Sequence, residues 1–578
     1  MLLELIKKTF RRGKAPADAQ ALAVAHYRRG ELEQAEHYFR ELAKQSPSDV
    51  TAWTNLAATL VRQQKHAAAI PVLLHVVELA PGLAEAHLDL GVCYNRLREN
   101  PEAIEHYARA IALKPDLHKA HANILGAHLE SCDWDAVDRW KADFTAYADK
   151  HPPALWAQRI EPFCALMLLP AESCRTLAIE RARQLADAAG GSTLCGPQPH
   201  SHAHGKIRVG YVSADFYNHA TAHLTHGLYE AHDRGAFEIY AYSTGPDDGS
   251  AYRKHIERTC DRFVDVRSET AERTAERVRA DGIDILVDMK GYTANSRLEI
   301  FARRPAPVQV AYLGYPGTTG AEFIDYFISD AVATPPGYES EFTERLVRLP
   351  HSYQVNDDRQ PIADVPLARA DHGLPEQSFV YCSFNRPGKI DRTIYGAWME
   401  ILRRVPQGVL WLIEDNPTAS GHLRRAAAAS GVASERIVFA EKADKPAHLA
   451  RHRLADLFLD TYACNAHTGA SDALWAGLPL LTCPGNVFSA RVAASLLHAA
   501  GLPELIAHSL DEYVNMAVRC AEDSAALGAL KAKLESTRLT CPLFDTPRYV
   551  RHLEAAYQTM HERRSRGLPP APFSVSPR

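Results

Sequence analysis

The chain has 578 residues, 46% of them apolar and 23% charged, which are the proportions of ordinary water-soluble globular proteins. A formal net charge of −5 argues against bulk attraction to nucleic acid, and no apolar run reaches the ~20 residues that a membrane span needs. The 11 cysteines are scattered without a C-x-x-C pair, which argues against a disulfide framework or a structural zinc site. We expect at least three structural units in a cytoplasmic protein with no nucleic-acid or membrane partner.

A repeat of 34 residues runs through the first part of the chain. Small, bulky and proline positions recur in phase: Ala23, Ala57 and Gly91; Ala35, Ala69 and Ala103; Phe39, Leu73 and Tyr107; Pro47, Pro81 and Pro115. This is the tetratricopeptide pattern, in which small residues let two helices cross closely and proline follows the second helix. A degenerate fourth unit covers 118–151, so we predict an α-solenoid over residues 1–151.

One position on the inner helix of this array carries Asn55, Asp89 and Asn123, again in step with the repeat. Side chains of this kind can hold the backbone of an extended peptide by hydrogen bonds. We predict an acceptor-peptide groove here. The alternative is an array that only docks onto the rest of the chain.

Residues 152–205 are predicted to be a helical connector that ends in a linker, Gly190–Gly205, whose histidines indicate a loop more than a metal site. From residue 206 short apolar runs alternate with helical segments, which indicates parallel sheets. The expected strands are Ile207–Ser213, Phe237–Ser243, Ile283–Met289, Val308–Leu313 and Tyr326–Ser329, then Phe379–Phe384, Val409–Ile413, Ile437–Ala440, Leu457–Asp460 and Leu480–Cys483. Two series predict two Rossmann-like lobes, 206–370 and 371–564, with a loosely ordered tail at 565–578.

The most informative motif follows the strand at 457–460. Residues 464–477 read C-N-A-H-T-G-A-S-D-A-L-W-A-G, in which small and hydroxyl residues open a helix. The start of a helix carries free N–H groups and partial positive charge, and therefore suits a phosphate. Asp472 lies one turn inside, within reach of a ribose hydroxyl. A strand, a small-residue turn and a helix together predict a nucleotide-diphosphate pocket.

Three further loops after strands contain reactive residues. His219 follows the first strand and is a candidate base or orienting group; a zinc site with His223 and His226 is conceivable, but no further ligand can be assigned. Residues 314–320, G-Y-P-G-T-T-G, form a turn that is neither a Walker A loop nor G-x-G-x-x-G. Lys389, in the loop after the first strand of the second lobe, can neutralise a diphosphate leaving group without a metal.

The motifs taken together resemble the O-linked N-acetylglucosamine (O-GlcNAc) transferase family. Tetratricopeptide repeats precede K-I-R-V-G-Y-V-S-A-D-F-Y-N-H (206–219), L-G-Y-P-G-T-T-G (313–320), F-N-R-P-G-K-I-D (384–391), the 464–477 motif and S-A-R-V-A-A-S (489–495). The resemblance covers nearly the whole chain and is greatest to bacterial members. It implies the two-lobed GT-B fold and an inverting, metal-independent transfer of N-acetylglucosamine from UDP-GlcNAc to Ser or Thr of proteins, with no cofactor.

The resemblance also implies roles for individual residues. His219 would lie near the acceptor and the anomeric carbon, and Lys389 at the diphosphate together with Thr468 and Gly469. Lys445 and Asp472 would hold the ribose. The uracil would be surrounded by Ala443, His448 and Arg451, and the sugar by Leu313, Gly314, Pro316 and His467.

This chain departs from the animal members in the lysine loop, where Arg386 and Gly388 replace glutamine and tyrosine, and at Gly469, which replaces a threonine. Two alternatives therefore stay open. One is a related transferase that uses GDP-fucose, as plant relatives do, or UDP-glucose. The other is a non-catalytic scaffold built on the repeats.

Overall fold

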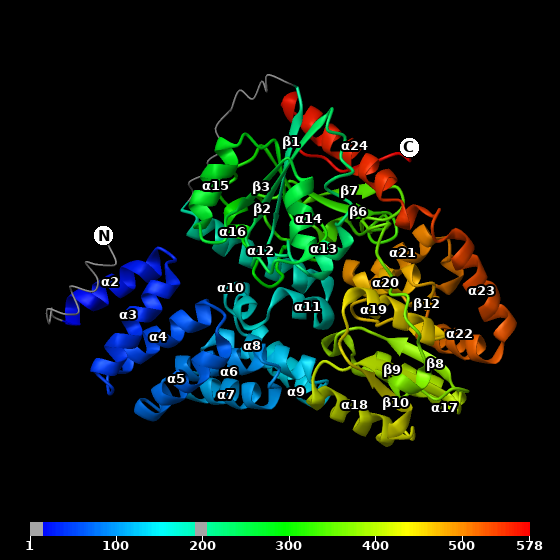
Figure 1. The fold of residues 1–578 in the computed structure, drawn as a ribbon, viewed down its shortest axis with the longest axis horizontal. Coiled ribbons are helices and arrows are strands. Elements are labelled where there is room, and N and C mark those ends of the chain that lie inside the picture. The colour runs from blue at the N-terminus through cyan, green and yellow to red at the C-terminus, as the bar shows by residue number, and fades with distance from the viewer. Residues whose placement is uncertain (1–15, 191–204, 578) are drawn as a thin grey trace. The chain divides into compact units, whose positions relative to one another are not determined.

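The computed structural model describes residues 16–190 and 205–577, and most of the predicted linker lies outside them. The chain forms two compact units, Met1–Asp149 with Gln158–Glu161 and Lys150–Ala157 with Pro162–Arg578. The first unit contains eight consecutive helices (Figure 1): α2 (Pro16–Arg28), α3 (Leu32–Gln45), α4 (Val50–Arg62), α5 (His66–Leu79), α6 (Ala84–Arg96), α7 (Asn100–Leu113), α8 (His118–Glu130) and α9 (Trp134–Ala148). They confirm the predicted repeat array.

The repeat positions are buried where the helices cross. The six small residues of the first three units have no exposed surface or, for Gly91, almost none, and the bulky residues Phe39, Leu73 and Tyr107 are 1–2% exposed. A Cβ added to Gly91 would lie 2.5 Å from the ring of Tyr107, a distance that no real packing allows. The small residue is therefore fixed by the approach of the next helix and not by helix propensity.

The turn between the two helices of each unit has a repeat of its own. Gly30, Gln64, Arg98 and Cys132 all adopt left-handed backbone conformations, with φ of 78°, 60°, 68° and 52°. Glycine takes this conformation without strain, whereas other residues bear a cost of about 1–2 kcal/mol. Only the first unit uses glycine, so the sequence pattern alone did not mark this position.

The second unit begins with short connecting helices and a long one: α10 (Pro153–Trp156), α11 (Pro162–Leu168) and α12 (Ala171–Ala188). Tyr292 donates its hydroxyl to Ala178 O at 3.1 Å, and Tyr315 donates to Pro162 O at 3.2 Å. The connector helices α11 and α12 are therefore packed onto the first lobe.

The first lobe has an all-parallel sheet of eight strands in the order β13-β7-β6-β5-β4-β1-β2-β3. Its strands are β1 (Ile207–Ser213), β2 (Phe237–Ser243), β3 (Arg262–Asp265), β4 (Ile285–Asp288), β5 (Val308–Ala311), β6 (Tyr326–Asp330), β7 (Arg345–Leu349) and β13 (Phe573–Ser574). The second lobe has a parallel sheet in the order β10-β9-β8-β11-β12, made of β8 (Phe379–Ser383), β9 (Gly408–Ile413), β10 (Ile437–Ala440), β11 (Leu457–Leu459) and β12 (Leu480–Leu481). Two buried parallel sheets confirm the predicted α/β architecture.

Three strands were not predicted. β3 and β7 are short, and charged residues leave each of them only two consecutive apolar residues, so they lack the continuous apolar run expected of a buried parallel strand. The tail was expected to be loosely ordered, and this was wrong for part of it: β13 pairs with β7, Phe573 lying opposite Val347.

The C-terminal helix α24 (Thr546–Ser565) was assigned to the second lobe by its place in the sequence, but it packs against the first (Figure 1). Tyr549 and Tyr312 share a hydrogen bond of 2.8 Å between their hydroxyls. Glu554 accepts from His232 Nδ1 at 3.0 Å and from the backbone N–H of Asp233. These are buried, long-range contacts that local sequence does not encode.

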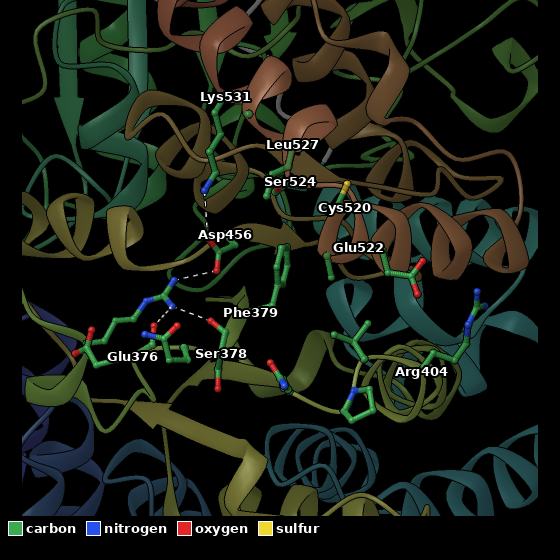
Figure 2. Close-up of a pocket in the computed structure, with 17 residues that line it drawn as sticks. Glu376, Ser378, Phe379, Arg404, Asp456, Cys520, Glu522, Ser524, Leu527 and Lys531 are labelled. Carbon is green, nitrogen blue, oxygen red and sulfur yellow. Dashed lines mark hydrogen bonds and ion pairs between the residues drawn. The ribbon is translucent and has the colours of Figure 1, made fainter.

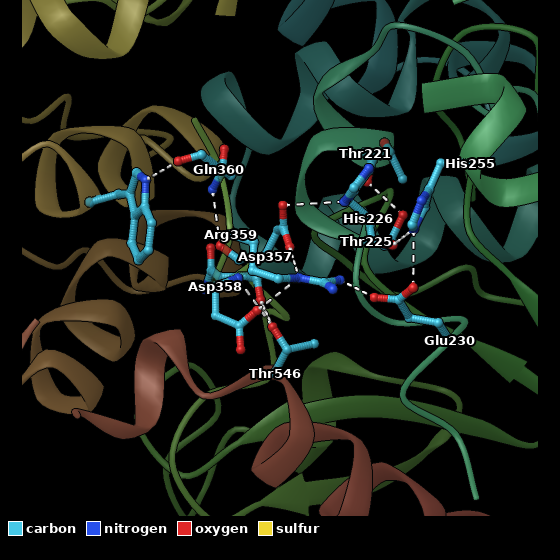
Figure 3. A network of polar contacts seen from close by, with 12 residues as sticks. Thr221, Thr225, His226, Glu230, His255, Asp357, Asp358, Arg359, Gln360 and Thr546 are labelled. Atoms are coloured by element: carbon cyan, nitrogen blue, oxygen red, sulfur yellow. Dashed lines mark hydrogen bonds and ion pairs between the residues drawn. The ribbon is translucent and has the colours of Figure 1, made fainter. Parts of the chain in front are cut away.

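The chain crosses from the first lobe to the second through the irregular segment 352–370. There Arg359 pairs with Glu230, and Asp357 Oδ2 lies 3.4 Å from His226 Nδ1 (Figure 3). On the other side Trp475 donates its indole N–H to Gln360 O at 3.0 Å. The crossing segment is therefore held by side chains of both lobes.

A direct contact also joins the lobes. Ser495 donates its hydroxyl to Asp330 Oδ2 at 2.6 Å, and Arg491 donates to Val332 O at 3.0 Å.

Across the described ranges 16–190 and 205–577, no helix combines the length and the apolar character that a bilayer crossing requires.

Candidate functional site

The loop after β11 is wound around a buried carboxylate. Asp460 Oδ1 accepts the backbone N–H groups of Thr461 at 2.8 Å and Ala466 at 2.6 Å, and Oδ2 accepts the hydroxyl of Thr482 at 2.7 Å. Burial raises the pKa of Asp460 to about 7. These bonds fix the path of the chain into helix α20 (Thr468–Trp475).

The start of α20 offers N–H groups that the protein does not use. Ala470 and Ser471 donate to His467 O at 3.1 and 3.2 Å, as expected of the first helical turn. In the described part of the chain, the backbone N–H groups of Thr468 and Gly469 make no hydrogen bond to protein. Such groups at a helix start, which carries partial positive charge, can bind an anion.

Lys389 lies against this loop. It ends the short turn Pro387–Lys389, and its Nζ donates to Asn465 O at 2.6 Å. The nearby His467 directs Nε2 to Ser489 O at 3.2 Å, and burial, with a smaller contribution from Lys389, lowers its pKa to about 3. An ammonium, a neutral imidazole and free backbone donors therefore converge at the start of α20.

A second cluster joins α20 to helix α19 (Lys445–Arg451). The Lys445 ammonium is hydrogen-bonded to Asp472 Oδ1, and both side chains are almost fully buried, 6% and 7% exposed. His448 Nε2 lies 3.8 Å from Asp472 Oδ2, and its Nδ1 contacts the Arg451 guanidinium. Burial, and then the neighbouring His452, Arg451 and Lys445, lower the pKa of His448, so that its ring is neutral.

The Arg451 guanidinium is held in turn by Glu441 O at 2.5 Å and by the ring of Phe384, whose centroid is 4.7 Å away. Burial lowers the pKa of Arg451 to about 10. Ala443, predicted beside it, lies in the exposed loop just before α19. The cluster presents flat groups and one buried carboxylate, a surface suited to a ribose and a planar base.

In the first lobe, His219 caps the short helix α13 (Ala220–Leu224): its Nδ1 accepts the backbone N–H of Thr221 at 3.2 Å. Its side chain is 38% exposed, and Nδ1 lies 3.5 Å from Asp215 Oδ2. Burial lowers the pKa of His219, Asp215 opposes this, and Lys290 and Arg386 add to it.

The turn after β5 approaches the backbone of the loop after β4. A Cβ on Gly314 would lie 2.0 Å from Met289 O, so only glycine fits there. Leu313 adopts a left-handed φ of 71° and Pro316 is buried. The turn is thus a rigid wall at the carboxyl end of the sheet.

Positive side chains of the second lobe act on histidines of the first lobe. Arg386 and Lys445, both in the second lobe, contribute to the lowered pKa values of His219 and His223 in the first. Helix α13, which His219 caps, also contacts α20 of the second lobe, so His219 and the start of α20 lie at facing edges of the two lobes. Asn55, Asp89 and Asn123 lie on α4, α6 and α8 of the other compact unit, partly exposed.

Sequence reasoning missed the acids that stand at strand ends. Asp460 directly follows β11, Asp215 lies two residues after the end of β1, and Asp288 is the last residue of β4. An acid in that position was the available signal, because the carboxyl ends of parallel strands line the ligand site. Within the described residues no three His, Cys, Asp or Glu side chains are grouped so as to hold a metal ion.

A separate pocket of about 670 Å³ lies at the other edge of the second sheet, where β8 and β11 begin (Figure 2). Three of its charged side chains already bind one another: Arg369 binds Asp456 Oδ2 at 2.9 Å and also Ser378 O at 2.7 Å, and Lys531 lies 3.3 Å from Asp456 Oδ1. None of the predicted site residues is among those that line it. We do not assign the candidate site to this pocket.

The chain is similar to known proteins over most of its length. The model of the family "Glycosyl transferase family 41" matches residues 177–367 and 361–553, and a tetratricopeptide repeat model matches 21–84 and 77–118. A solved lysine-to-methionine mutant of the O-GlcNAc transferase from Thermobaculum terrenum superposes with a TM-score of 0.72 at 29% sequence identity, over 96% of this chain and 98% of that one.

Two curated relatives carry related names. A probable UDP-N-acetylglucosamine–peptide N-acetylglucosaminyltransferase, SEC, from Arabidopsis thaliana is 42% identical over 376 residues, which is 64% of this chain and 38% of the relative. A UDP-N-acetylglucosamine–peptide N-acetylglucosaminyltransferase from Caenorhabditis elegans is 31% identical, over 63% of this chain and 41% of the relative. The chain thus spans about two fifths of the length of these relatives.

Proposed function

Because the chain belongs to glycosyl transferase family 41, we propose that it transfers N-acetylglucosamine from UDP-GlcNAc to Ser and Thr hydroxyls of proteins. The observation that carries this proposal is the Lys389 ammonium bonded to Asn465 O at 2.6 Å, in the loop that opens α20. A cation beside free N–H donors at a helix start suits a diphosphate.

The diphosphate would bind Lys389 and the backbone N–H groups of Thr468 and Gly469, with the Thr468 hydroxyl as a further donor. The ribose hydroxyls would meet the Lys445–Asp472 pair, which can both donate and accept. The uracil would lie among Ala443, His448 and Arg451. The names of the relatives that match this chain support a UDP-linked N-acetylglucosamine as donor.

The sugar would rest between the first-lobe turn of Leu313, Gly314 and Pro316 and the second-lobe His467. The acceptor hydroxyl would attack the anomeric carbon from the side opposite the diphosphate. The new C–O bond would form as the bond to the UDP oxygen breaks, with inversion of the configuration, and the hydroxyl proton would pass to a phosphate oxygen of the departing UDP or to water. Lys389 and the α20 donors stabilise the negative charge that develops on the departing UDP, so this site requires no metal. His219, at the edge of the first lobe, would orient the reacting groups.

We propose further that the acceptor polypeptide runs along the groove that carries Asn55, Asp89 and Asn123, where the side chains hold its backbone by hydrogen bonds. We also propose the cytoplasm as the place of this reaction.

Thermal unfolding with UDP, UDP-GlcNAc, UDP-glucose and GDP-fucose, with EDTA present throughout, tests the donor assignment. A ligand at about 100 times its Kd stabilises the folded state by ~2.7 kcal/mol. Stabilisation by UDP and UDP-GlcNAc supports the proposal. Stabilisation by GDP-fucose alone contradicts the proposed uracil contacts and indicates a fucosyltransferase. If none of the four ligands stabilises the protein, the proposal of an enzyme is wrong and the non-catalytic repeat scaffold is favoured.

A further inference from the structure

A buried ion pair stands behind His219 in the first lobe. Lys290 Nζ donates to Asp215 Oδ2 at 2.6 Å, and the two side chains are only 6% and 5% exposed. The backbone of Lys290 is fixed as well, since its N–H and that of Gly291 donate to the Asp288 carboxylate at 3.0 and 2.8 Å. Lys290 therefore reaches Asp215 from a rigid turn, and not as a mobile surface charge.

The hydrogen bonds of His219 define where its proton lies. Nδ1 accepts the backbone N–H of Thr221 at 3.2 Å. Asp215 Oδ2 is 3.5 Å from the same nitrogen, but that oxygen already accepts from Lys290 at 2.6 Å and from the Thr221 hydroxyl at 3.2 Å. A neutral imidazole has one N–H and one lone pair, so a ring that accepts at Nδ1 carries its proton on Nε2.

We propose that Lys290 is a positioning residue that holds Asp215 in an ion pair, so that His219 stays neutral and presents an Nε2–H donor, and not a lone pair, to a bound ligand. The use of this donor in the reaction rests on the proposed function, where it would bind an oxygen of the donor or the acceptor. The proton acceptor of the reaction is then a group other than His219. The position of the proton is a property of the free protein and is testable without any substrate.

The charged groups around His219 show how Lys290 affects the charge state of its ring. The titratable or charged neighbours, from its own loop, from α13, from the loop after β4 and from the second lobe, are Asp215, Tyr217, His223, Lys290 and Arg386. Among them Asp215 is the one that raises the pKa of His219, and it is the group that Lys290 neutralises. An uncompensated carboxylate within ~4–6 Å raises such a pKa by about 1–3 units.

Nitrogen NMR of the free protein labelled with ¹⁵N-histidine tests the proposal, with His219→Asn identifying the signal. We expect the wild type to show a neutral His219 ring protonated at Nε2. In Lys290→Met the freed Asp215 should draw a proton to Nδ1, and the ring should stay charged to a pH about 1–3 units higher. Lys254→Met, the same change at an exposed lysine of this lobe, should leave the signal as it is.

A double variant guards against misfolding of Lys290→Met, because Asp215→Asn with Lys290→Met leaves no buried unpaired charge. We expect it to restore the neutral ring. In turnover, Lys290→Met should raise the pH at which kcat falls on the acid side of its pH profile, by the same interval. The double variant should return that pH to its wild-type value. A wild-type ring protonated at Nδ1, or a Lys290→Met signal identical to wild type, overturns the proposal. The proposed function fails separately, if no donor sugar is transferred while the NMR result holds.

Discussion

Replacing Lys389 by methionine removes the ammonium from the proposed diphosphate site while keeping a side chain of similar length. The lysine Nζ is 2.6 Å from Asn465 O, and for a diphosphate oxygen bound beside it we take ~4 Å as the separation of the two charges. Two unit charges about 4 Å apart at an effective dielectric of ~20 interact by about 4 kcal/mol. Each ~1.4 kcal/mol lost from the transition state costs a factor of ten, so we expect kcat to fall about 10²–10³-fold, the range seen when one charge-stabilising donor is removed.

The assay is release of UDP from UDP-GlcNAc in the presence of an acceptor protein, at saturating donor and with EDTA present. Lys533→Met is the matched control, since Lys533 lies on α23 (Ser524–Thr537), 44% exposed and paired with Glu504. It should keep full kcat. Melting curves establish that Lys389→Met is folded. A folded Lys389→Met protein that retains a kcat within about threefold of wild type would refute the electrostatic role of Lys389.

Three further predictions concern binding, packing and pH. Asp472→Asn leaves Lys445 without its carboxylate partner, and because a hydrogen bond to a charged group contributes about 1.5–3 kcal/mol, calorimetry should show UDP bound about 10- to 150-fold more weakly; an unchanged Kd contradicts the ribose assignment. Gly320→Ala places a Cβ 2.2 Å from the backbone of α12, whereas the Cβ of Gly337→Ala meets nothing within 4 Å and both glycines have positive φ; the first variant should lose about 1–3 kcal/mol more stability than the second, and equal melting temperatures would exclude the close packing. His467 has a pKa lowered from 6.5 to about 3, so its contribution to stability is present above about pH 6.5 and is lost as the pH falls towards 3. In denaturant unfolding, the free energy of unfolding of the wild type should therefore fall relative to that of His467→Asn between about pH 7 and about pH 5. A difference that stays constant with pH would show that His467 is not held neutral.

The repeats and most of the strands could be predicted because their signals are periodic and local. The small residue at Gly91 is predicted by the 34-residue step. The structure gives its physical reason, because a Cβ at this position would lie 2.5 Å from the ring of Tyr107. Ile207–Ser213 and Ile437–Ala440 have the predicted bounds. Continuous apolar runs of this kind have few other interpretations in an alternating α/β chain.

The parts that sequence did not predict depend on contacts between distant residues. Lys290 is an ordinary lysine until the β1–β4 pairing places it at Asp215, 75 residues away. Helix α24 looks like the end of the second lobe, yet Tyr549 and Glu554 bind groups of the first. β7 has arginine at two of its five positions, Arg345 and Arg348, and its place is set by its pairing with β6 in the sheet. Tertiary context decides such elements, and no local pattern reports it.

The central claim is that this site moves N-acetylglucosamine to protein hydroxyls, and mass spectrometry of an acceptor protein tests it most directly. The purified protein is incubated with UDP-GlcNAc and EDTA, and the acceptor is fragmented so that modified residues are located. We predict Ser or Thr residues that carry one N-acetylhexosamine, absent with Lys389→Met. An unmodified acceptor, a sugar on another residue type, or transfer that EDTA abolishes would contradict the account.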